Sequence, residues 1–175
     1  MSHSTRRSAG RASSGRRHLS KAMLLPMTRQ AVSDVSLANH LALAVCRRGL
    51  GNAHQLSELI RVVYLTYCLQ QSGFGDAPVD LYRRAEVALD QAGVRGQCDG
   101  VWEVSAELAG VLEEILAIHD LQLMSVTIRH VMEAKARLSR FSKSELRSPI
   151  SDDAQTNHRR DDAGLNASRT TSGLQ

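Results

Sequence analysis

The histidines are the first residues whose chemistry could define a function, because imidazoles bind metals between facing helices. A di-iron bundle needs Glu-x-x-His, so that a carboxylate and an imidazole share one helix face. Leu116 stands three residues before His119, and Gly51 stands three residues before His54. HExxH and zinc-type Cys/His spacings are absent too. His40, His54 and His119 could converge in space, but we predict scattered surface or interface histidines and no metal.

Paired acids, nucleophiles and glycine-rich loops form no catalytic pattern. Glu113 and Glu114 are adjacent on a predicted helix and point about 100° apart, so they do not flank one bond. Neither Cys46 nor Cys68 has a general base at a recognisable spacing. The glycines of RRGLGN and SGFGD lack the GK[ST] or GxGxxG pattern of phosphate loops. We therefore predict a non-enzymatic protein without a cofactor.

A basic segment at the N-terminus is the clearest chemical signal. Residues 1–33 carry seven Lys and Arg and no acid, whereas residues 34–147 carry twelve Lys and Arg against fourteen acids. Arginines in an acid-free chain suit counterion-releasing contacts with phosphates, which need charge but no folded surface. An inert solubilising tail and an organelle-targeting segment are the alternatives. The predicted nucleic-acid-binding residues are Arg6, Arg7, Arg11, Arg16, Arg17 and Lys21.

Composition divides the chain into three parts. Residues 1–27 are predicted to be a disordered basic arm, and residues 148–175 a disordered polar tail, because neither offers enough apolar surface to offset the entropy of ordering. Residues 28–147 are predicted to form one folded helical domain. Three cysteines without a CxxC pair indicate free thiols and a cytoplasmic protein. No stretch approaches the ~20 apolar residues of a membrane span, so we expect no membrane contact.

The spacing of apolar residues predicts an all-α fold, a small bundle of three helices plus one long C-terminal helix. The first helix is predicted to begin at Ser33 or Asp34 and to end before Gly49. The second begins after Asn52 and is apolar on most of its circumference, which places it in the middle of the bundle. The third begins near Pro78 and ends before the turn-rich stretch GVRGQCDG.

The last helix is predicted to follow Ser105 and to continue for about 36 residues, roughly 54 Å at 1.5 Å per residue. Its C-terminal half could project and offer an apolar stripe as a homodimer interface. The stripe could instead fold back onto the other helices, and a break near Asp120 is a further alternative. The predicted interface residues are Leu121, Met124, Ile128, Val131 and Leu138.

Two stretches resemble a group of short bacterial helical proteins, the Fis-type transcriptional regulators. They are RHLSKAMLLPMTRQAVSDVSLANHLALAV and GLGNAHQLSELIRVVYLTYCLQQSGFGD, and the resemblance covers roughly residues 17–140. It implies DNA binding. However, Fis proteins end in a helix-turn-helix with a basic recognition helix, whereas this chain ends in an apolar-striped helix and a polar tail. No functional residue is therefore carried over from the family.

These observations predict a non-enzymatic bacterial protein, a transcriptional regulator whose folded part makes protein contacts and whose basic arm contacts DNA. The prediction depends on the location of the excess positive charge, which lies outside the folded domain. The alternative is a protein–protein interaction module or homodimer with no nucleic-acid role.

Overall fold

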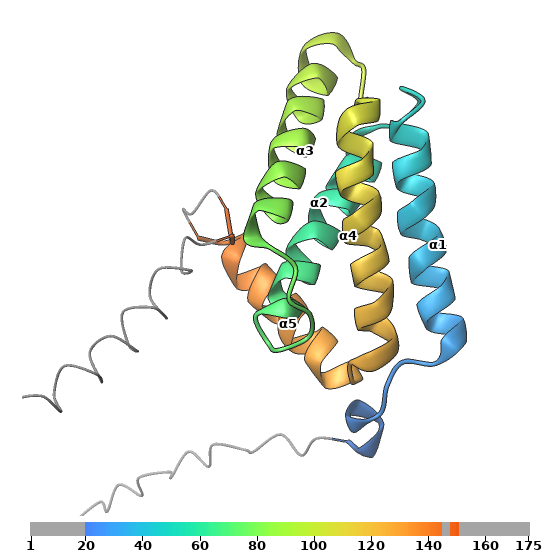
Figure 1. Ribbon diagram of the computed structural model, residues 1–175, viewed down its shortest axis with the longest axis vertical. Helices are drawn as coiled ribbons and strands as arrows, with labels where there is room; N and C mark the ends of the chain where they lie inside the picture. Colours follow the sequence, from blue (N-terminus) through green and yellow to red (C-terminus); the bar gives the residue numbers. More distant parts are fainter. Residues whose placement is uncertain (1–19, 145–147, 151–175) are drawn as a thin grey trace, which may run out of the picture.

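The computed structural model describes residues 20–144 and 148–150. In this part the chain forms one short 3₁₀ helix, η1 (Lys21–Leu24), and five α-helices. The α-helices are α1 (Arg29–Cys46), α2 (Ala53–Gln70), α3 (Val79–Asp99), α4 (Ala106–Ser125) and α5 (Ile128–Phe141). The first four run alternately up and down as a bundle, and α5 crosses one end of it (Figure 1). The all-α prediction is confirmed.

Side-chain caps explain where the first two α-helices begin. Asn52 begins α2 with a capping box, in which its side chain accepts the N–H of Gln55 and the Gln55 side chain accepts the N–H of Asn52. Thr28 caps α1 by accepting the N–H of Ala31 at 3.2 Å. The predicted cap of α2 is therefore correct, whereas α1 begins before the predicted start at Ser33.

α3 continues through the stretch predicted to be a turn. It ends where Gly100 adopts the left-handed conformation, with φ of +73°. Position 96, inside the helix, requires a glycine because the indole of Trp102 packs against the backbone there. An added Cβ would come within 2.2 Å of the ring. A glycine that resembled a turn signal is thus a packing requirement.

The core has two clusters, and α2 contributes to both. The first fills the bundle and includes Tyr67 and Tyr82, whose rings meet edge to face at 5.4 Å. Ile150, assigned from the sequence to the polar tail, is buried in this cluster. The second cluster joins α2 to α5 and consists of Leu65, Cys68, Leu69, Val126 and Ala134. Since α2 contacts α1, α3, α4 and α5, its predicted central position is confirmed.

The chain leaves the helical conformation between α4 and α5. Val126 and Thr127 are extended, with φ/ψ of −81°/150° and −76°/157°. Val126 is fully buried, and the N–H of Ile128 donates to the carbonyl of Leu25 at 2.9 Å. Pro26 and Thr127 form an antiparallel bridge. Three consecutive β-branched residues, which lower helix propensity, mark the same place in the sequence.

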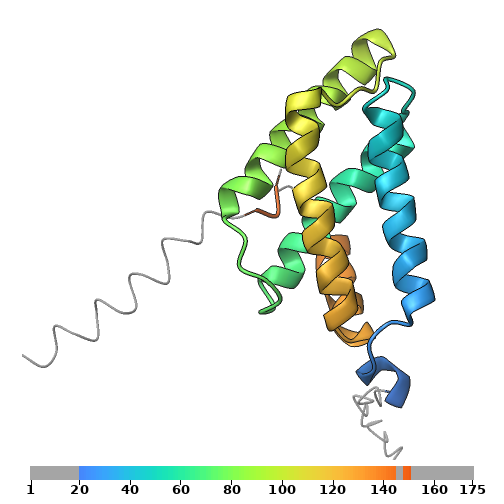
Figure 2. The ribbon, with the colours of Figure 1, turned by 45° about the vertical axis from the view of Figure 1, so that its right-hand side comes forward.

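The predicted single long helix after Ser105 is therefore wrong, and two helices take its place. The break follows Ser125, beyond the position near Asp120 that the sequence left as an alternative. Figure 2 shows α5 at the end of the bundle where α4 ends, and α5 packs against α2 and η1. Of the two arrangements considered for the apolar stripe, folding back onto the bundle is the one observed.

Gly96→Ala should lower the free energy of unfolding by about 1–3 kcal/mol, because the new methyl group overlaps the Trp102 indole. Gly93→Ala is a matched control in the same helix, since its Cβ would meet a Leu56 methyl group at an ordinary 3.5 Å. This control should gain up to about 1 kcal/mol from helix propensity. Urea denaturation measures both values, and equal stabilities would contradict the packing of Trp102 on α3.

Candidate functional site

Most of the predicted nucleic-acid-binding residues lie outside the described part of the chain, namely Arg6, Arg7, Arg11, Arg16 and Arg17. Lys21 is described and lies exposed in η1. η1 packs against α5, and the Leu25 carbonyl that follows it accepts the N–H of Ile128. Residues 21–26, which the sequence assigned to the arm, are therefore held beside the first turn of α5.

α5 presents exposed positive charge to the solvent. At 100° per residue, three cations of α5 lie on the side opposite Val131 and Leu138, and a fourth follows two residues after the helix ends; we call these four the α5 basic face. Among these four, Arg129 has an ion-pair partner within residues 20–144, the carboxylate of Glu133 at 2.7 Å. The α5 basic face consists of Arg129, Arg137, Arg140 and Lys143.

α4 carries the opposite charge. Its range contains Glu107, Glu113, Glu114 and Asp120 but no Lys or Arg. Two of these acids are engaged by α1. Arg47 forms an ion pair with Glu113, while Asp120 accepts a 2.9 Å hydrogen bond from the Ser36 hydroxyl and lies 3.0 Å from His40 Nε2. The break after α4 thus separates an acidic helix from a basic one.

The predicted interface residues divide into two groups. Leu121 and Met124 are 64% and 58% exposed on α4. Val131 and Leu138 are half-buried against the second core cluster, and Ile128 is half-buried in the first turn of α5. The five residues do not form one stripe, because the helix break turns α5 away from the direction of α4.

Leu121 and Met124 instead form a surface with α1. The contacts of Asp120 with Ser36 and His40 join the two helices, and the helical spacing then places Leu37 and Leu41 on the same outer side. Both leucines are exposed. We call this surface the α1/α4 apolar face, and it consists of Leu37, Leu41, Leu121 and Met124.

A buried hydrogen-bond network joins α2 to α4. The Thr66 hydroxyl donates to the carbonyl of Val62 at 2.8 Å, so its oxygen accepts from His119, whose Nδ1 lies 3.1 Å away. The Gln122 amide nitrogen donates to the carbonyls of Thr66 at 3.1 Å and Phe74 at 2.7 Å. His119 is therefore held as the neutral tautomer with its proton on Nδ1, and Nε2 is left as an acceptor.

Burial lowers the pKa of His119 to about 4. The residue is 3% exposed, and the positive charges of Lys135 and Arg61 lower the pKa further, whereas Asp120 opposes the shift. At neutral pH the imidazole is uncharged. It therefore acts as a hydrogen-bonding group in the core and adds no cation to it.

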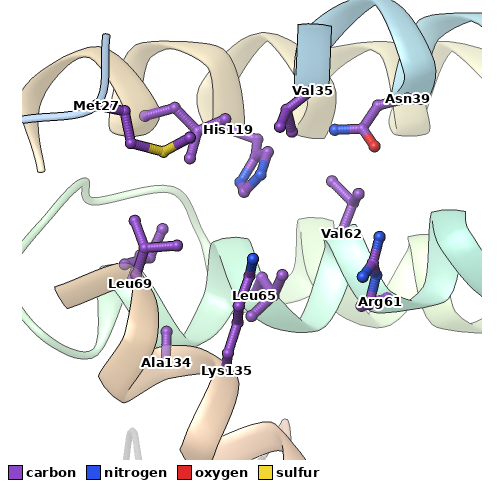
Figure 3. A pocket seen from close by; sticks show the side chains of 12 residues that line it. Met27, Val35, Asn39, Arg61, Val62, Leu65, Leu69, His119, Ala134 and Lys135 are labelled. Carbon is purple, nitrogen blue, oxygen red and sulfur yellow. The ribbon is translucent and has the colours of Figure 1, made fainter. Parts of the chain in front are cut away.

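His119 also lines a cavity of ≈ 80 Å³ between α1, α2, α4 and α5 (Figure 3). The lining is apolar except for Asn39, Arg61, His119 and Lys135. Asn39 is 4% exposed, and its amide nitrogen has no hydrogen-bond partner in the described part of the chain. A buried donor without a partner is rare in proteins, so this cavity is a candidate binding site.

Metal and thiol chemistry have no candidate centre in this part of the structure. Within residues 20–144 and 148–150, no group of three or more His, Cys, Asp or Glu side chains could hold a metal ion. Burial raises the pKa of the Cys46 and Cys68 thiols, so both stay protonated at neutral pH. The same residues include no helix long and apolar enough to cross a membrane.

Sequence reasoning missed Asn39, Lys135 and the position of His119. Asn39 stands seven residues from both Val32 and Cys46, so a polar residue on the inward face of α1 was a usable signal. Lys135 had no such signal, because it reaches the cavity only when α5 folds back. The cations of α5 were visible in the sequence, but their position beside η1 was not.

Comparisons with known proteins provide no family for the chain. No protein-family model, no curated protein and no solved structure matches it. The function is therefore inferred from the α5 basic face, the α1/α4 apolar face and the cavity.

Acid should destabilise the fold through His119. Between its ordinary pKa of 6.5 and about 4, the unfolded chain binds a proton on His119 that the folded chain does not, so stability falls as the pH drops through this window. The full loss is about 3 kcal/mol at 1.36 kcal/mol per pKa unit. His119→Asn, whose amide can still donate to Thr66, should lose this dependence. Urea denaturation at several pH values tests this, and an equal slope in both proteins would contradict it.

Proposed function

We propose that the protein is a non-enzymatic regulator that binds nucleic acid through the α5 basic face together with the N-terminal basic arm. The observation that supports this most strongly is the exposed, outward position of Arg137, Arg140 and Lys143, for which the described residues supply no ion-pair partner. Exposed cations without an ion-pair partner release counterions from phosphates when they bind, which favours attachment to a polyanion.

The position of η1 connects the two basic parts. η1 lies within the arm and carries Lys21, and it is held at the start of α5 by the hydrogen bond between Leu25 and Ile128. α5 has 14 residues, which gives it a length of about 21 Å, or about six base pairs of duplex. A single duplex could therefore contact the helix and the arm together.

The chemistry of these contacts favours affinity over sequence selection. Arg and Lys on a solvated face bind phosphates and position a protein on the duplex, whereas sequence is read by side chains inserted among base edges. The apolar side of α5 packs on α2, so the helix presents its outer side to a partner, where Met132 is exposed beside the cations. We expect steeply salt-dependent binding with little sequence preference.

Replacing Arg137, Arg140 and Lys143 together by Gln should weaken binding to duplex DNA. The slope of log affinity against log salt should fall in magnitude by about 2 to 3, because each phosphate contact contributes about 0.9. Fluorescence anisotropy with a duplex of about 20 base pairs, between about 50 and 200 mM salt, measures this slope.

The matched control replaces Arg47, Arg48 and Arg95 by Gln, which changes the net charge equally at the end of the bundle far from α5 (Figure 1). The control should bind like the wild type. Equal weakening in both variants would remove the α5 basic face from the proposal, and no binding by the wild type at low salt would contradict the proposal as a whole. The arm is tested by replacing its five arginines, Arg6, Arg7, Arg11, Arg16 and Arg17.

Self-association through the α1/α4 apolar face is the second candidate function. Exposed large apolar residues that lie together on a surface favour a protein partner. In a two-fold symmetric dimer the face would pack against its own copy, with the Asp120 contacts to Ser36 and His40 near its centre. The acidic charges of α4 do not oppose this, since Asp120 already contacts His40 of α1 and Glu113 is paired with Arg47, which directly follows α1.

Leu37→Asp combined with Leu121→Asp should convert such a dimer to a monomer, because two buried carboxylates on each side would lose their hydration. Val87→Asp, at a similarly exposed apolar position on α3, is the control that should leave the dimer intact. Sedimentation velocity measures the molecular mass of all three proteins. A monomeric wild type would rule out this candidate.

A further inference from the structure

We propose that the cavity between α1, α2, α4 and α5 binds a small monocarboxylate with a short apolar chain. This site goes beyond nucleic-acid binding and does not depend on it. The inference stands on the distribution of polar and apolar groups around the cavity and on a buried amide donor that the fold leaves without a partner.

The polar side chains line one end and the middle of the cavity, with Val35 and Val62 among them, and the other end is apolar. Figure 3 shows Asn39 and Arg61 towards one end and Met27 and Leu69 towards the other, with His119 and Lys135 pointing in between them. Leu123 from α4 also lines the cavity. A ligand that matches this lining has one polar group and one apolar part.

The polar end offers hydrogen-bond donors. The Asn39 amide nitrogen is buried and has no acceptor among the described residues, although leaving such a group unpaired destabilises the fold. An oxygen of a bound molecule could accept this hydrogen bond. The guanidinium of Arg61 and the ammonium of Lys135 are donors as well, so the three groups together match an acceptor with more than one oxygen.

The charges select an anion. Arg61 and Lys135 both line the cavity and bring two positive charges to it. Arg61 also forms an ion pair with Glu58, but Lys135 has no ion-pair partner within residues 20–144. A carboxylate would complete this arrangement, because charge-assisted hydrogen bonds to Lys and Arg are stronger than neutral ones. A primary amine would be repelled by the same side chains.

The volume limits the length of the apolar part. The cavity measures ≈ 80 Å³, about half of the ~150 Å³ that accommodates benzene in an apolar cavity. About three carbons therefore fit inside, which matches the propyl chain of butyrate directed towards Met27 and Leu69, with the carboxylate at the rim where Arg61 and Lys135 are exposed. Butyrate is therefore the probe of choice.

Titration of the full chain with butyrate, followed by ¹H–¹⁵N correlation spectra, tests the site. Butyrate should cause saturable shifts in the amides around Asn39, His119 and Ala134. Butyramide and butylamine, which have the same chain without the anionic group, should not. Absence of saturable shifts with butyrate, which is the result expected if the cavity holds only water, would overturn the proposal, and so would equal binding of all three compounds.

Two variants separate binding from folding. Asn39→Leu keeps the shape of the side chain but removes the unpaired donor, so the melting temperature should rise while butyrate binding weakens roughly tenfold. Lys135→Met keeps most of the exposed stem, leaves the core intact and should weaken binding by a similar factor. Arg48→Met, far from the cavity, removes the same charge and should bind like the wild type. Unchanged binding in Lys135→Met would overturn the proposal even if Asn39→Leu fails to fold.

Discussion

The burial of α2 on nearly all sides is the constraint on which the rest of the structure depends. Each exposed Å² of apolar surface on this helix would forfeit about 25 cal/mol. α1, α3 and α4 cover most of α2, but Leu65, Cys68 and Leu69 need a further element, and α5 provides it. α5 reaches them because the chain becomes extended at Val126 and Thr127.

That single change of direction produces the surfaces on which function is proposed. It turns the apolar side of α5 inward and the α5 basic face outward, beside η1 and the arm. It also leaves Leu121 and Met124 in solvent, where they join the exposed leucines of α1. Finally, it brings Lys135 to a cavity whose other polar groups, Asn39, Arg61 and His119, come from α1, α2 and α4. Packing of the core and placement of charge therefore have one cause.

The features that sequence reasoning predicted correctly are local ones. The all-α fold, the cap at Asn52 and the central place of α2 follow from nearby residues. The α4–α5 break could not be found from apolar spacing, because Met124 and Ile128 continue the helical pattern across it. What holds the break is the hydrogen bond from Ile128 to Leu25, about a hundred residues away in the chain. The candidate site was missed for the same reason, since Asn39 and Lys135 meet only in the folded chain.

The most direct test of the nucleic-acid account is to map the amides of the full chain that shift when duplex DNA is added at low salt. The largest shifts should fall on residues 1–25 and on α5, because the arm and the α5 basic face are expected to contact phosphates together. The C-terminal ends of α1 and α3, at the far end of the bundle, should change least. Shifts concentrated on those ends, or no shifts at all, would contradict the account.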